Sequence, residues 1–222
     1  MENLTLIIPA KNEKESLPIF LKEIEKYKCN KIVIIDSHDT ETEESIKNFR
    51  TIKIIIQKKN GYGNALIEGI QSVRTEYCCI INADGSMDPS YLFAKLEICK
   101  NCDFVFSSRY MKEGGSEDDD LITFVGNKLF TIIGNIFFSL NISDILYTYI
   151  MAKTSSINKI NLINQDFRIC VELPIKAKRL GYQLRSIPSF ERVRIGGLKK
   201  VKPFKDGFLI LIELIRLFFN KK

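Results

Sequence analysis

Short apolar runs alternate with longer amphipathic stretches through the first half of the chain. Five runs rich in β-branched and aromatic residues predict strands, and these are LTLIIPA (4–10), KIVIID (31–36), TIKIIIQ (51–57), YCCIIN (77–82) and DFVFSS (103–108). Between them, apolar residues at three- and four-residue spacing predict helices, with faces formed by Leu17, Phe20, Leu21 and Ile24, by Leu66, Ile70 and Val73, and by Leu92, Leu96 and Cys99. This alternation predicts an α/β fold with a mostly parallel central sheet flanked by helices.

The end of the chain carries a different pattern. Phe208, Leu211, Ile212, Ile215 and Phe219 recur at helical spacing and predict an amphipathic helix at about 204–219. Two interpretations stay open: an interfacial helix on a membrane surface, or a helix packed on its own domain. No internal repeat, low-complexity tract or Pro/Gly linker divides the sequence, so we expect residues 1–222 to form one domain.

Two apolar segments could in principle cross a membrane. The first, 121–142, is interrupted by Asn127, Lys128 and Asn135, and the second, 204–219, carries four charged residues. Neither reaches the roughly 18 uninterrupted apolar residues of a membrane span. The opening MENLTLIIPA does not resemble a signal peptide, so we expect a cytoplasmic protein.

Composition and charge narrow the classes further. The net charge of +6 is uneven, because the segment GGLKKVKPFKDG (196–207) contains four lysines. This favours an anionic partner such as a membrane surface or a phosphate group, and no nucleic acid is expected. The six cysteines lie mostly inside apolar runs, and the single Cys99-x-x-Cys102 pair lacks the second pair of a zinc site. A reduced protein without a disulfide framework follows, and the only histidine, His38, leaves no His-based triad elsewhere.

Polar loops follow every predicted strand. Ligands of open α/β sheets bind at the carboxyl ends of the strands, and the loops there read PAKNEKES, DSHDTE, KKNGYGNA, ADGSMDP and SRYMKEGG. Five such loops on one edge of the sheet predict a binding site.

The glycine-rich loop NGYGNALIEG (60–69) does not match a dinucleotide-binding motif, because Leu66 stands where the third glycine belongs. It instead predicts a helix N-terminus at Gly61 and Gly63, a place that binds phosphate well. Lys58 and Lys59 add positive charge there.

The loop NADGSMDP (82–89) offers oxygen ligands. Asp84 can bind Mg²⁺ or Mn²⁺, with Ser86 within reach of the same ion and a neutral carbonyl oxygen at Asn82. The alternative is a plain turn at Asp84, with Asp88 preceding the next helix.

Two more loops carry charge. Arg109, at the end of the fifth predicted strand, suits a diphosphate, although a salt bridge is the commoner fate of an arginine. The acidic segment EGGSEDDD (113–120) is typical of a mobile, solvated lid.

Taken in order, these motifs resemble the family 2 glycosyltransferases of the GT-A fold, and within them the polyprenyl (dolichyl) phosphate sugar transferases, such as dolichol-phosphate mannosyltransferase. The similar segments are IIPAKNEKESL, VIIDSHDTE, KKNGYGNAL, NADGS at the family's Asp-x-Asp, SSRYMKEGG, ISDILYTYIMAK, DFRICVELPIKAKRLGY and IPSFERVRIGGLKKV. The resemblance runs nearly from end to end.

The resemblance implies roles for particular residues. The nucleotide-sugar contacts would be Pro9, Ala10, Asn12, Glu13, Asp36, Lys58, Gly63, Asn82, Ala83 and Asp84. Asp84, with Ser86, would hold Mg²⁺ or Mn²⁺ against the leaving diphosphate. Arg109, Arg194 and Lys200 would bind phosphate charge.

The family pattern also implies that the acceptor is a polyprenyl or dolichyl phosphate. A phosphate acceptor is already ionised at pH 7 and needs no strong base, whereas a sugar hydroxyl would need one. The candidate bases in that case would be Glu172, Asp144 and the acids at 118–120.

Four departures from the family pattern bear on the mechanism. Asn82 replaces the first acid of the Asp-x-Asp motif, which should loosen metal binding, and Leu198-Lys199 replaces Glu-Ser. The acceptor-side stretch keeps Asp144 but lacks its glycine and phenylalanine, and a second arginine that the family pattern places before Asn127 has no clear match.

The predicted function is therefore inverting transfer of a sugar from a UDP- or GDP-linked donor to a polyprenyl or dolichyl phosphate. The protein would act as a peripheral enzyme at the cytoplasmic face of the membrane. One alternative is transfer to a glycan hydroxyl in cell-envelope polysaccharide synthesis. Another, motivated by Asn82, is a non-catalytic nucleotide-sugar binding subunit.

Overall fold

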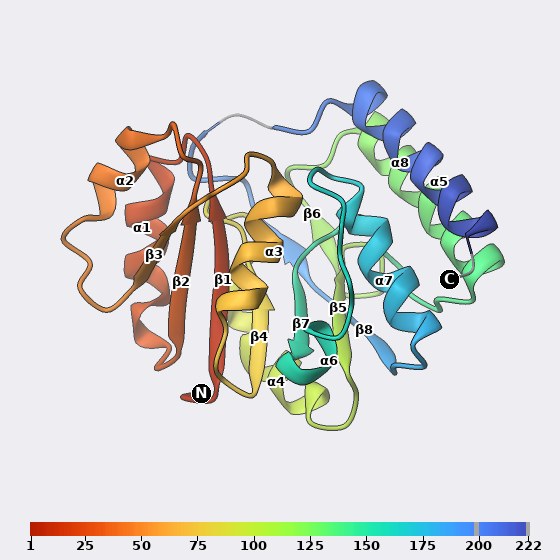
Figure 1. The fold of residues 1–222 in the computed structure, drawn as a ribbon, viewed down its shortest axis with the longest axis horizontal. Coiled ribbons are helices and arrows are strands. Elements are labelled where there is room, and N and C mark those ends of the chain that lie inside the picture. Colours follow the sequence, from red (N-terminus) through yellow and green to blue (C-terminus); the bar gives the residue numbers. More distant parts are fainter. Residues whose placement is uncertain (198–199, 221–222) are drawn as a thin grey trace.

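A computed structural model of the chain describes residues 1–197 and 200–220, which form a central sheet covered by helices on both faces (Figure 1). Leu198-Lys199, which stands where the family pattern has Glu-Ser, lies outside the described residues. The strands of this sheet are β1 (Leu4–Ala10), β2 (Asn30–Ile35), β3 (Lys53–Ile56), β4 (Tyr77–Ile80), β5 (Phe104–Ser108), β7 (Ile150–Lys153) and β8 (Leu184–Pro188). A separate two-stranded sheet pairs β6 (Gly115–Ser116) with β9 (Phe190–Glu191).

The helices complete the alternation. They are α1 (Ser16–Glu23), α2 (Thr40–Ile46), α3 (Tyr62–Ser72), α4 (Leu92–Cys99), α5 (Leu121–Phe138), α6 (Thr154–Ile157), α7 (Ile169–Arg179) and α8 (Pro203–Phe219), with short 3₁₀ helices η1 (Ile24–Lys26) and η2 (Pro89–Tyr91). All the apolar helix positions predicted for α1, α3 and α4 are buried, and α8 covers the predicted C-terminal helix.

The central sheet is mostly parallel, as predicted. Its strand order is β3-β2-β1-β4-β7-β5-β8, and within the described ranges only β7 runs antiparallel to its neighbours. The five predicted strands are all present, with ends within two residues of the predicted ones. Since β1 to β5 point the same way, the polar loops that follow them meet at one edge of the sheet.

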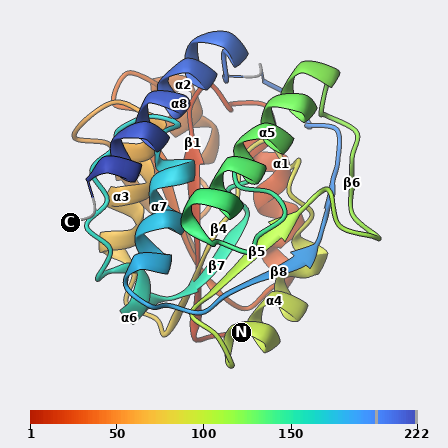
Figure 2. The same ribbon diagram turned by 90° about the vertical axis from the view of Figure 1, so that its right-hand side faces the viewer.

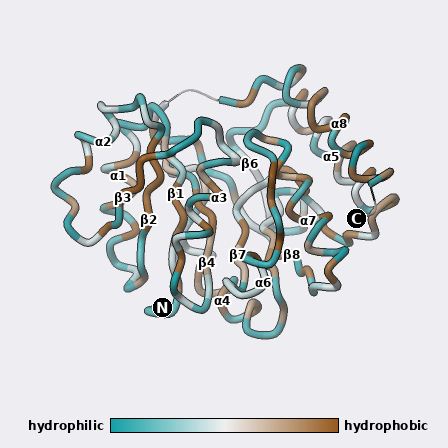
Figure 3. The backbone as a smooth tube through the Cα atoms, in the orientation of Figure 1, coloured by the Kyte–Doolittle hydropathy of each residue, from teal (hydrophilic) through white to brown (hydrophobic). Residues whose placement is uncertain are grey.

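Each face of the sheet has its own apolar core. Side chains alternate along a strand, so Ile7 of β1 packs with α3 and α7, whereas Leu6 and Ile8 pack with α1 and α4. The central strands are accordingly the hydrophobic, brown segments of the tube in Figure 3. All six cysteines are free, and all but Cys29 are buried, which agrees with the predicted absence of a disulfide framework.

Helices α5 and α8 lie side by side at the end of the molecule farthest from β3 (Figures 1 and 2). Phe130 of α5 lies near Gly207 of α8, and the rings of Phe137 and Phe218 meet edge to face at 5.5 Å. Contrary to our expectation for 121–142, α5 is long and apolar enough to cross a membrane, and it is the one such helix among the described residues. Asn127 and Asn135 interrupt the apolar pattern of α5 without interrupting the helix.

Candidate functional site

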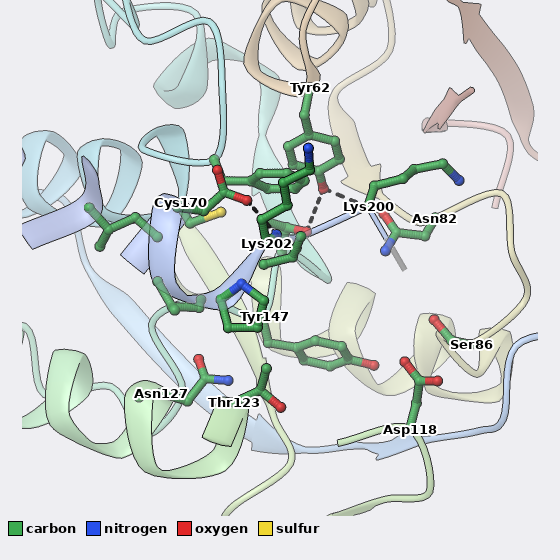
Figure 4. Close-up of a pocket in the computed structure, with 18 of the residues that line it drawn as sticks. Tyr62, Asn82, Ser86, Asp118, Thr123, Asn127, Tyr147, Cys170, Lys200 and Lys202 are labelled. Carbon is green, nitrogen blue, oxygen red and sulfur yellow. Dashed lines mark hydrogen bonds between the residues drawn. The ribbon is translucent and has the colours of Figure 1, made fainter. Parts of the chain in front are cut away.

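A cavity of about 1130 Å³ opens at the carboxyl edge of the sheet and extends from the loops after β1, β2 and β4 to helices α5 and α8 (Figure 4). Most of the residues predicted for the site line it: Pro9, Ala10, Asn12, Glu13, Asp36, Asn82, Ala83, Asp84, Ser86, Arg109, Arg194 and Lys200. The fold therefore brings together residues that lie up to 191 positions apart, from Pro9 to Lys200.

Asp84 lies at the centre of the polar part of the lining. Its Oδ1 accepts hydrogen bonds from the backbone N–H of Ser86 at 3.1 Å and from the Ser86 hydroxyl at 2.8 Å. Its Oδ2 accepts no hydrogen bond from the described residues and lies 3.8 Å from Nη1 of Arg194. Asp84 thus forms the predicted turn through one carboxylate oxygen, and its other oxygen remains available to a ligand in the cavity.

The donor set around Asp84 fits a divalent ion only in part. Asn82 offers its side-chain oxygen, which is 3.4 Å from the Tyr62 hydroxyl, but no cluster of three acidic, histidine or cysteine side chains suited to a metal occurs in residues 1–197 and 200–220. Mg²⁺ is commonly held by one or two carboxylates together with substrate phosphates and water. The site therefore suits an ion that arrives with a diphosphate better than one bound by protein alone.

Asp36, at the end of β2, is fixed in the cavity wall. Its Oδ2 accepts a hydrogen bond from Nζ of Lys11 at 2.8 Å, and its Oδ1 accepts one from the backbone N–H of His38 at 3.1 Å. Burial alone would raise the pKa of Asp36, but these donors lower it below its ordinary value. An ionised, oriented carboxylate is what recognition of a nucleotide base or ribose requires.

Glu13 lines the cavity but its carboxylate is already bound. It accepts hydrogen bonds from the hydroxyl of Ser16 and from Nζ of Lys200, and a Cβ at Gly197 would lie 3.0 Å from its Oε2. Gly197 has φ +79°, so this close passage of the chain depends on glycine. Glu13 thus fastens the segment around Lys200 to the loop after β1.

Arg109 forms an ion cluster, the commoner fate that the sequence left open. Its Nε and Nη2 donate to Asp144 at 2.8 and 3.1 Å, and its Nη1 donates to Glu191 at 3.1 Å. Burial would lower the pKa of Arg109, but Asp144 and then Glu191 raise it well above the ordinary value. Its guanidinium also lies 4.6 Å from the ring centre of Tyr147.

The acidic segment 113–120 is tied down, unlike the mobile lid expected from the sequence. Its β6 residues pair with β9, and Asp118 accepts a hydrogen bond from Nε of Arg194 at 3.1 Å as part of a two-bond pair. The pKa of Arg194 is raised, mainly by this contact with Asp118. Asp118 thus binds Arg194, the residue that was predicted to bind a phosphate group.

Glu172 does not reach the cavity, which corrects its prediction as a catalytic residue. Its carboxylate is fully buried and accepts hydrogen bonds from the backbone N–H groups of Ile163 and Asn164, from the Asn164 side chain and from Lys176. A carboxylate held by four donors in the interior cannot approach an acceptor hydroxyl. Glu172 instead fastens the loop before α7 to that helix.

Gly63 and Lys58 also lie outside the cavity lining. The backbone N–H groups of Gly63 and Asn64 donate to the carbonyl oxygen of Gln165 at 2.9 and 3.3 Å, and a Cβ at Gly63 would lie 2.2 Å from the carbonyl oxygen of Asn164. The N-terminus of α3 is therefore closed by protein. The sequence had suggested that it binds a phosphate, and that prediction is wrong. Lys58 is exposed, and its backbone N–H donates to Glu68.

Several lining residues were not singled out for the site from the sequence. They are Lys11, Tyr62, Thr123, Asn127, Tyr147 and Lys202. The Tyr62 hydroxyl shares a hydrogen bond of 2.6 Å with Thr148, and burial raises its pKa. Two of them had left a signal: Asn127 as a polar residue inside an apolar helix, and Lys202 as one of the four lysines of 196–207.

Comparison with known proteins places this geometry in context. The model of the family described as "Glycosyl transferase family 2" matches residues 5–160. A protein named as an uncharacterized glycosyltransferase in Mycobacterium bovis is 31% identical over 109 residues, and so is a counterpart in Mycobacterium tuberculosis. Each alignment covers 48% of this chain and 48% of the relative, so the chain spans about half the length of the curated relatives it matches.

Solved structures match over nearly the whole chain. Glucosyl-3-phosphoglycerate synthase from Mycobacterium tuberculosis, in complex with Mn²⁺, UDP and phosphoglyceric acid, has a TM-score of 0.72 at 13% identity, covering 97% of this chain and 78% of that one. Mannosyl-3-phosphoglycerate synthase from Rubrobacter xylanophilus has a TM-score of 0.68 at 13% identity, covering 96% and 73%. At such low identity the likeness shows the fold, and the fold is the GT-A fold that the sequence motifs predicted.

Proposed function

Because the chain belongs to glycosyl transferase family 2, we propose that it transfers a sugar from a UDP- or GDP-linked donor to a polyprenyl or dolichyl phosphate at the cytoplasmic face of a membrane. The observation that carries the proposal is the exposed apolar surface of α5 and α8, which borders the cavity because both helices also contribute residues to its lining. The protein would be bound peripherally through α5 and α8.

The apolar surface is extensive and continuous with the cavity. On α5 the exposed large apolar residues are Leu121, Ile122, Phe124, Val125, Leu129, Ile132, Ile136 and Phe137. On α8 they are Phe204, Phe208, Leu211, Ile212, Ile215, Phe218 and Phe219. The apolar face predicted for the C-terminal helix therefore does not pack on its own domain. A patch of this kind on two neighbouring helices, with lysines at its edge, suits the lipid–water interface.

The donor would occupy the polar end of the cavity. Asp36 would contact the nucleoside, and Arg194 and Lys200 would bind the diphosphate after exchanging their present partners, Asp118 and Glu13. Exchange of a carboxylate for a phosphate preserves the charge-assisted hydrogen bonds of these cations. The two ion pairs hold the side chains in place until the donor binds.

A divalent ion, Mg²⁺ or Mn²⁺, would neutralise charge on the leaving diphosphate. The residues that would hold it are Asp84, through Oδ2, and Asn82, through its side-chain oxygen, while the Ser86 hydroxyl orients Asp84. The glucosyl-3-phosphoglycerate synthase with the same fold holds Mn²⁺ and UDP. Loss of one acid at Asn82 is consistent with an ion that binds together with its nucleotide.

The acceptor would be an ionised phosphate, because most of the candidate bases are engaged. Asp144 is held by Arg109, and Glu172 is buried away from the cavity. Asp119 accepts hydrogen bonds from Tyr110 and Thr123. A phosphate oxygen needs no base: it would attack the anomeric carbon from the face opposite the diphosphate, which leaves with the electron pair of the broken bond. This single displacement would invert the configuration.

A transfer screen tests the proposal, with Asp84→Asn as the diagnostic variant. Purified protein is incubated with UDP- and GDP-sugars, Mg²⁺ or Mn²⁺, and a polyprenyl phosphate in detergent. We expect metal-dependent product, reduced about 100-fold in Asp84→Asn since one charged oxygen ligand of the diphosphate-bound ion is lost, on the scale of removing one stabilising group from a transition state.

Asp88→Asn is the matched control, because Asp88 lies in the same loop, caps η2 and does not line the cavity. Asparagine caps helices as well as aspartate does, so this variant should keep full activity. Transfer to a glycan hydroxyl but not to the lipid phosphate would point to the polysaccharide alternative. Binding of the donor without any transfer would support the non-catalytic subunit.

A further inference from the structure

The cations that line the cavity are neutralised with one exception. The pairs are Lys11 with Asp36 at 2.8 Å, Arg109 with Asp144 at 2.8 Å, Arg194 with Asp118 at 3.1 Å, and Lys200 with Glu13. Lys202 also lines the cavity, and its Nζ has no acidic partner or hydrogen bond within residues 1–197 and 200–220. A lysine without a counter-ion beside a cavity is available to an incoming anion.

A second residue of the cavity lining, on α5, has an unmet hydrogen-bonding group. Asn127 of α5 is 6% exposed, and its buried Oδ1 has no hydrogen-bond partner among the described residues. Leaving such an atom unpaired costs about 1–3 kcal/mol, and most buried polar atoms in native proteins are paired. Since Asn127 lines the cavity (Figure 4), a ligand there can supply the missing partner.

The surroundings of these two residues define the shape of that ligand. Lys202 is the N-cap residue of α8 and Asn127 lies in the first half of α5, the two helices with exposed apolar faces. The lining next to them includes Leu129 and Phe130 from α5 and Phe204 and Phe208 from α8, together with Asp206, whose carboxylate accepts a hydrogen bond from the backbone N–H of Lys202 at 2.7 Å. One cation and one amide beside an apolar wall suit a molecule with an anionic head and an apolar stem.

We propose that Lys202 and Asn127 form a subsite for the anionic group of the acceptor, an organic monophosphate, apart from the donor diphosphate at Arg194 and Lys200. Nζ of Lys202 donates charge-assisted hydrogen bonds to the phosphate oxygens. The Asn127 amide supplies a donor or an acceptor, because rotation about its last side-chain bond exchanges its oxygen and nitrogen. The identification of the bound anion as the acceptor rests on the proposed function, but binding of an anion at this subsite can be measured without turnover.

The test uses calorimetry to measure the binding of two monophosphates to the protein saturated with UDP and Mg²⁺. Farnesyl monophosphate represents a lipid head group, and 3-phosphoglycerate represents a soluble phosphorylated acceptor. The variants are Lys202→Gln, Lys202→Arg and Asn127→Leu. Lys205→Gln is the matched control, because Lys205 is an exposed lysine in the first turn of α8 that does not line the cavity.

We expect Lys202→Gln to weaken monophosphate binding at least tenfold, Lys202→Arg to retain most of it, and Asn127→Leu to weaken it several-fold. Lys205→Gln should leave it unchanged, and UDP binding should be the same in all variants. A lipid source predicts that farnesyl monophosphate binds at least tenfold more tightly than 3-phosphoglycerate, and the reverse order indicates a soluble acceptor at the same subsite.

Equal monophosphate affinity in the wild type and Lys202→Gln, with both folded by circular dichroism, would overturn the subsite. Absence of binding of both UDP and GDP by the wild type would instead overturn the proposed function. The two failures are therefore distinct.

Discussion

The side chain of Lys95 pairs with no carboxylate among residues 1–197 and 200–220. It is fully buried on α4, where Nζ donates to the carbonyl oxygen of Tyr149 at 2.6 Å and to the Ser107 hydroxyl at 3.0 Å. Nζ also lies 3.3 Å from the ring centre of Tyr149. Burial without a carboxylate lowers the pKa of Lys95 from 10.5 to about 8. This lysine therefore joins α4 to β5 and to the residue before β7.

The lowered pKa of Lys95 predicts a pH dependence of stability. Between about pH 8 and 10.5 the unfolded chain binds more protons at this lysine than the folded protein does, so its contribution to the free energy of unfolding rises with pH. From pH 7.5 to 9.5 we expect a gain of about 1–2 kcal/mol in the wild type relative to Lys95→Met. Urea unfolding of both proteins at the two pH values measures the difference, and parallel pH profiles would contradict it.

At the scale of elements, α5 has its polar and apolar faces reversed relative to a helix of a soluble protein. Its buried residues include Asn127, Thr131 and Gly134, whereas Ile136 is 68% exposed. The Thr131 hydroxyl accepts a hydrogen bond from the backbone N–H of Ile145, so the inward polar face has structural partners. α5 also packs on α8 through the rings of Phe137 and Phe218, while most of its large apolar side chains stay exposed.

The reversed face of α5 predicts where vesicles bind. Replacing Ile132 and Ile136 together by asparagine should reduce flotation with phospholipid vesicles at least tenfold, because each isoleucine contributes about 1.5–3 kcal/mol when buried in an apolar phase. Both are more than half exposed, so the melting temperature should change little.

Ile19→Asn is the matched control for this experiment. Ile19 is similarly exposed but lies on α1, among the elements that the α5–α8 pair does not cover. It should float like the wild type. Unchanged flotation of the Ile132/Ile136 variant would exclude the α5 face as the membrane contact.

At the scale of the whole molecule, one ion cluster connects three distant segments. Arg109 follows β5, Asp144 lies between α5 and β7, and Glu191 belongs to β9, so the bonded residues are 35 and 82 positions apart in the chain. Burial raises the pKa of Glu191, and Arg109 opposes that rise. The cluster fixes the two-stranded sheet and its acidic loop over the cavity.

Removing the central cation should destabilise the whole fold. Arg109→Met leaves two buried carboxylates without their partner, and breaking a buried pair in this way typically costs about 3–5 kcal/mol. The double variant Arg109→Met/Asp144→Asn should cost less than the sum of the single variants, which denaturant unfolding can measure. Wild-type stability of Arg109→Met together with lost transfer would return Arg109 to the substrate-binding role that the sequence suggested.

The sequence by itself determined the features that depend on neighbours along the chain. Periodicity located β1 to β5 and the buried faces of α1, α3 and α4, because side-chain burial repeats with the geometry of a strand or helix. The rule that loops converge at strand ends placed Asp36, Asn82 and Asp84 in one cavity. These results needed no knowledge of distant contacts.

Only the tertiary structure decided what each functional side chain faces. Glu172, Gly63 and Arg109 have the residue types that a site requires. Gly63 and Arg109 are committed to partners far along the chain, and Glu172 is committed to the loop before its own helix. The orientation of α5 is a second example, since the sequence of an apolar helix with two asparagines, Asn127 and Asn135, does not reveal which side is outward. Hydrogen bonds and ion pairs act over a few ångströms in space, and sequence spacing does not specify which side chains the fold brings within that distance.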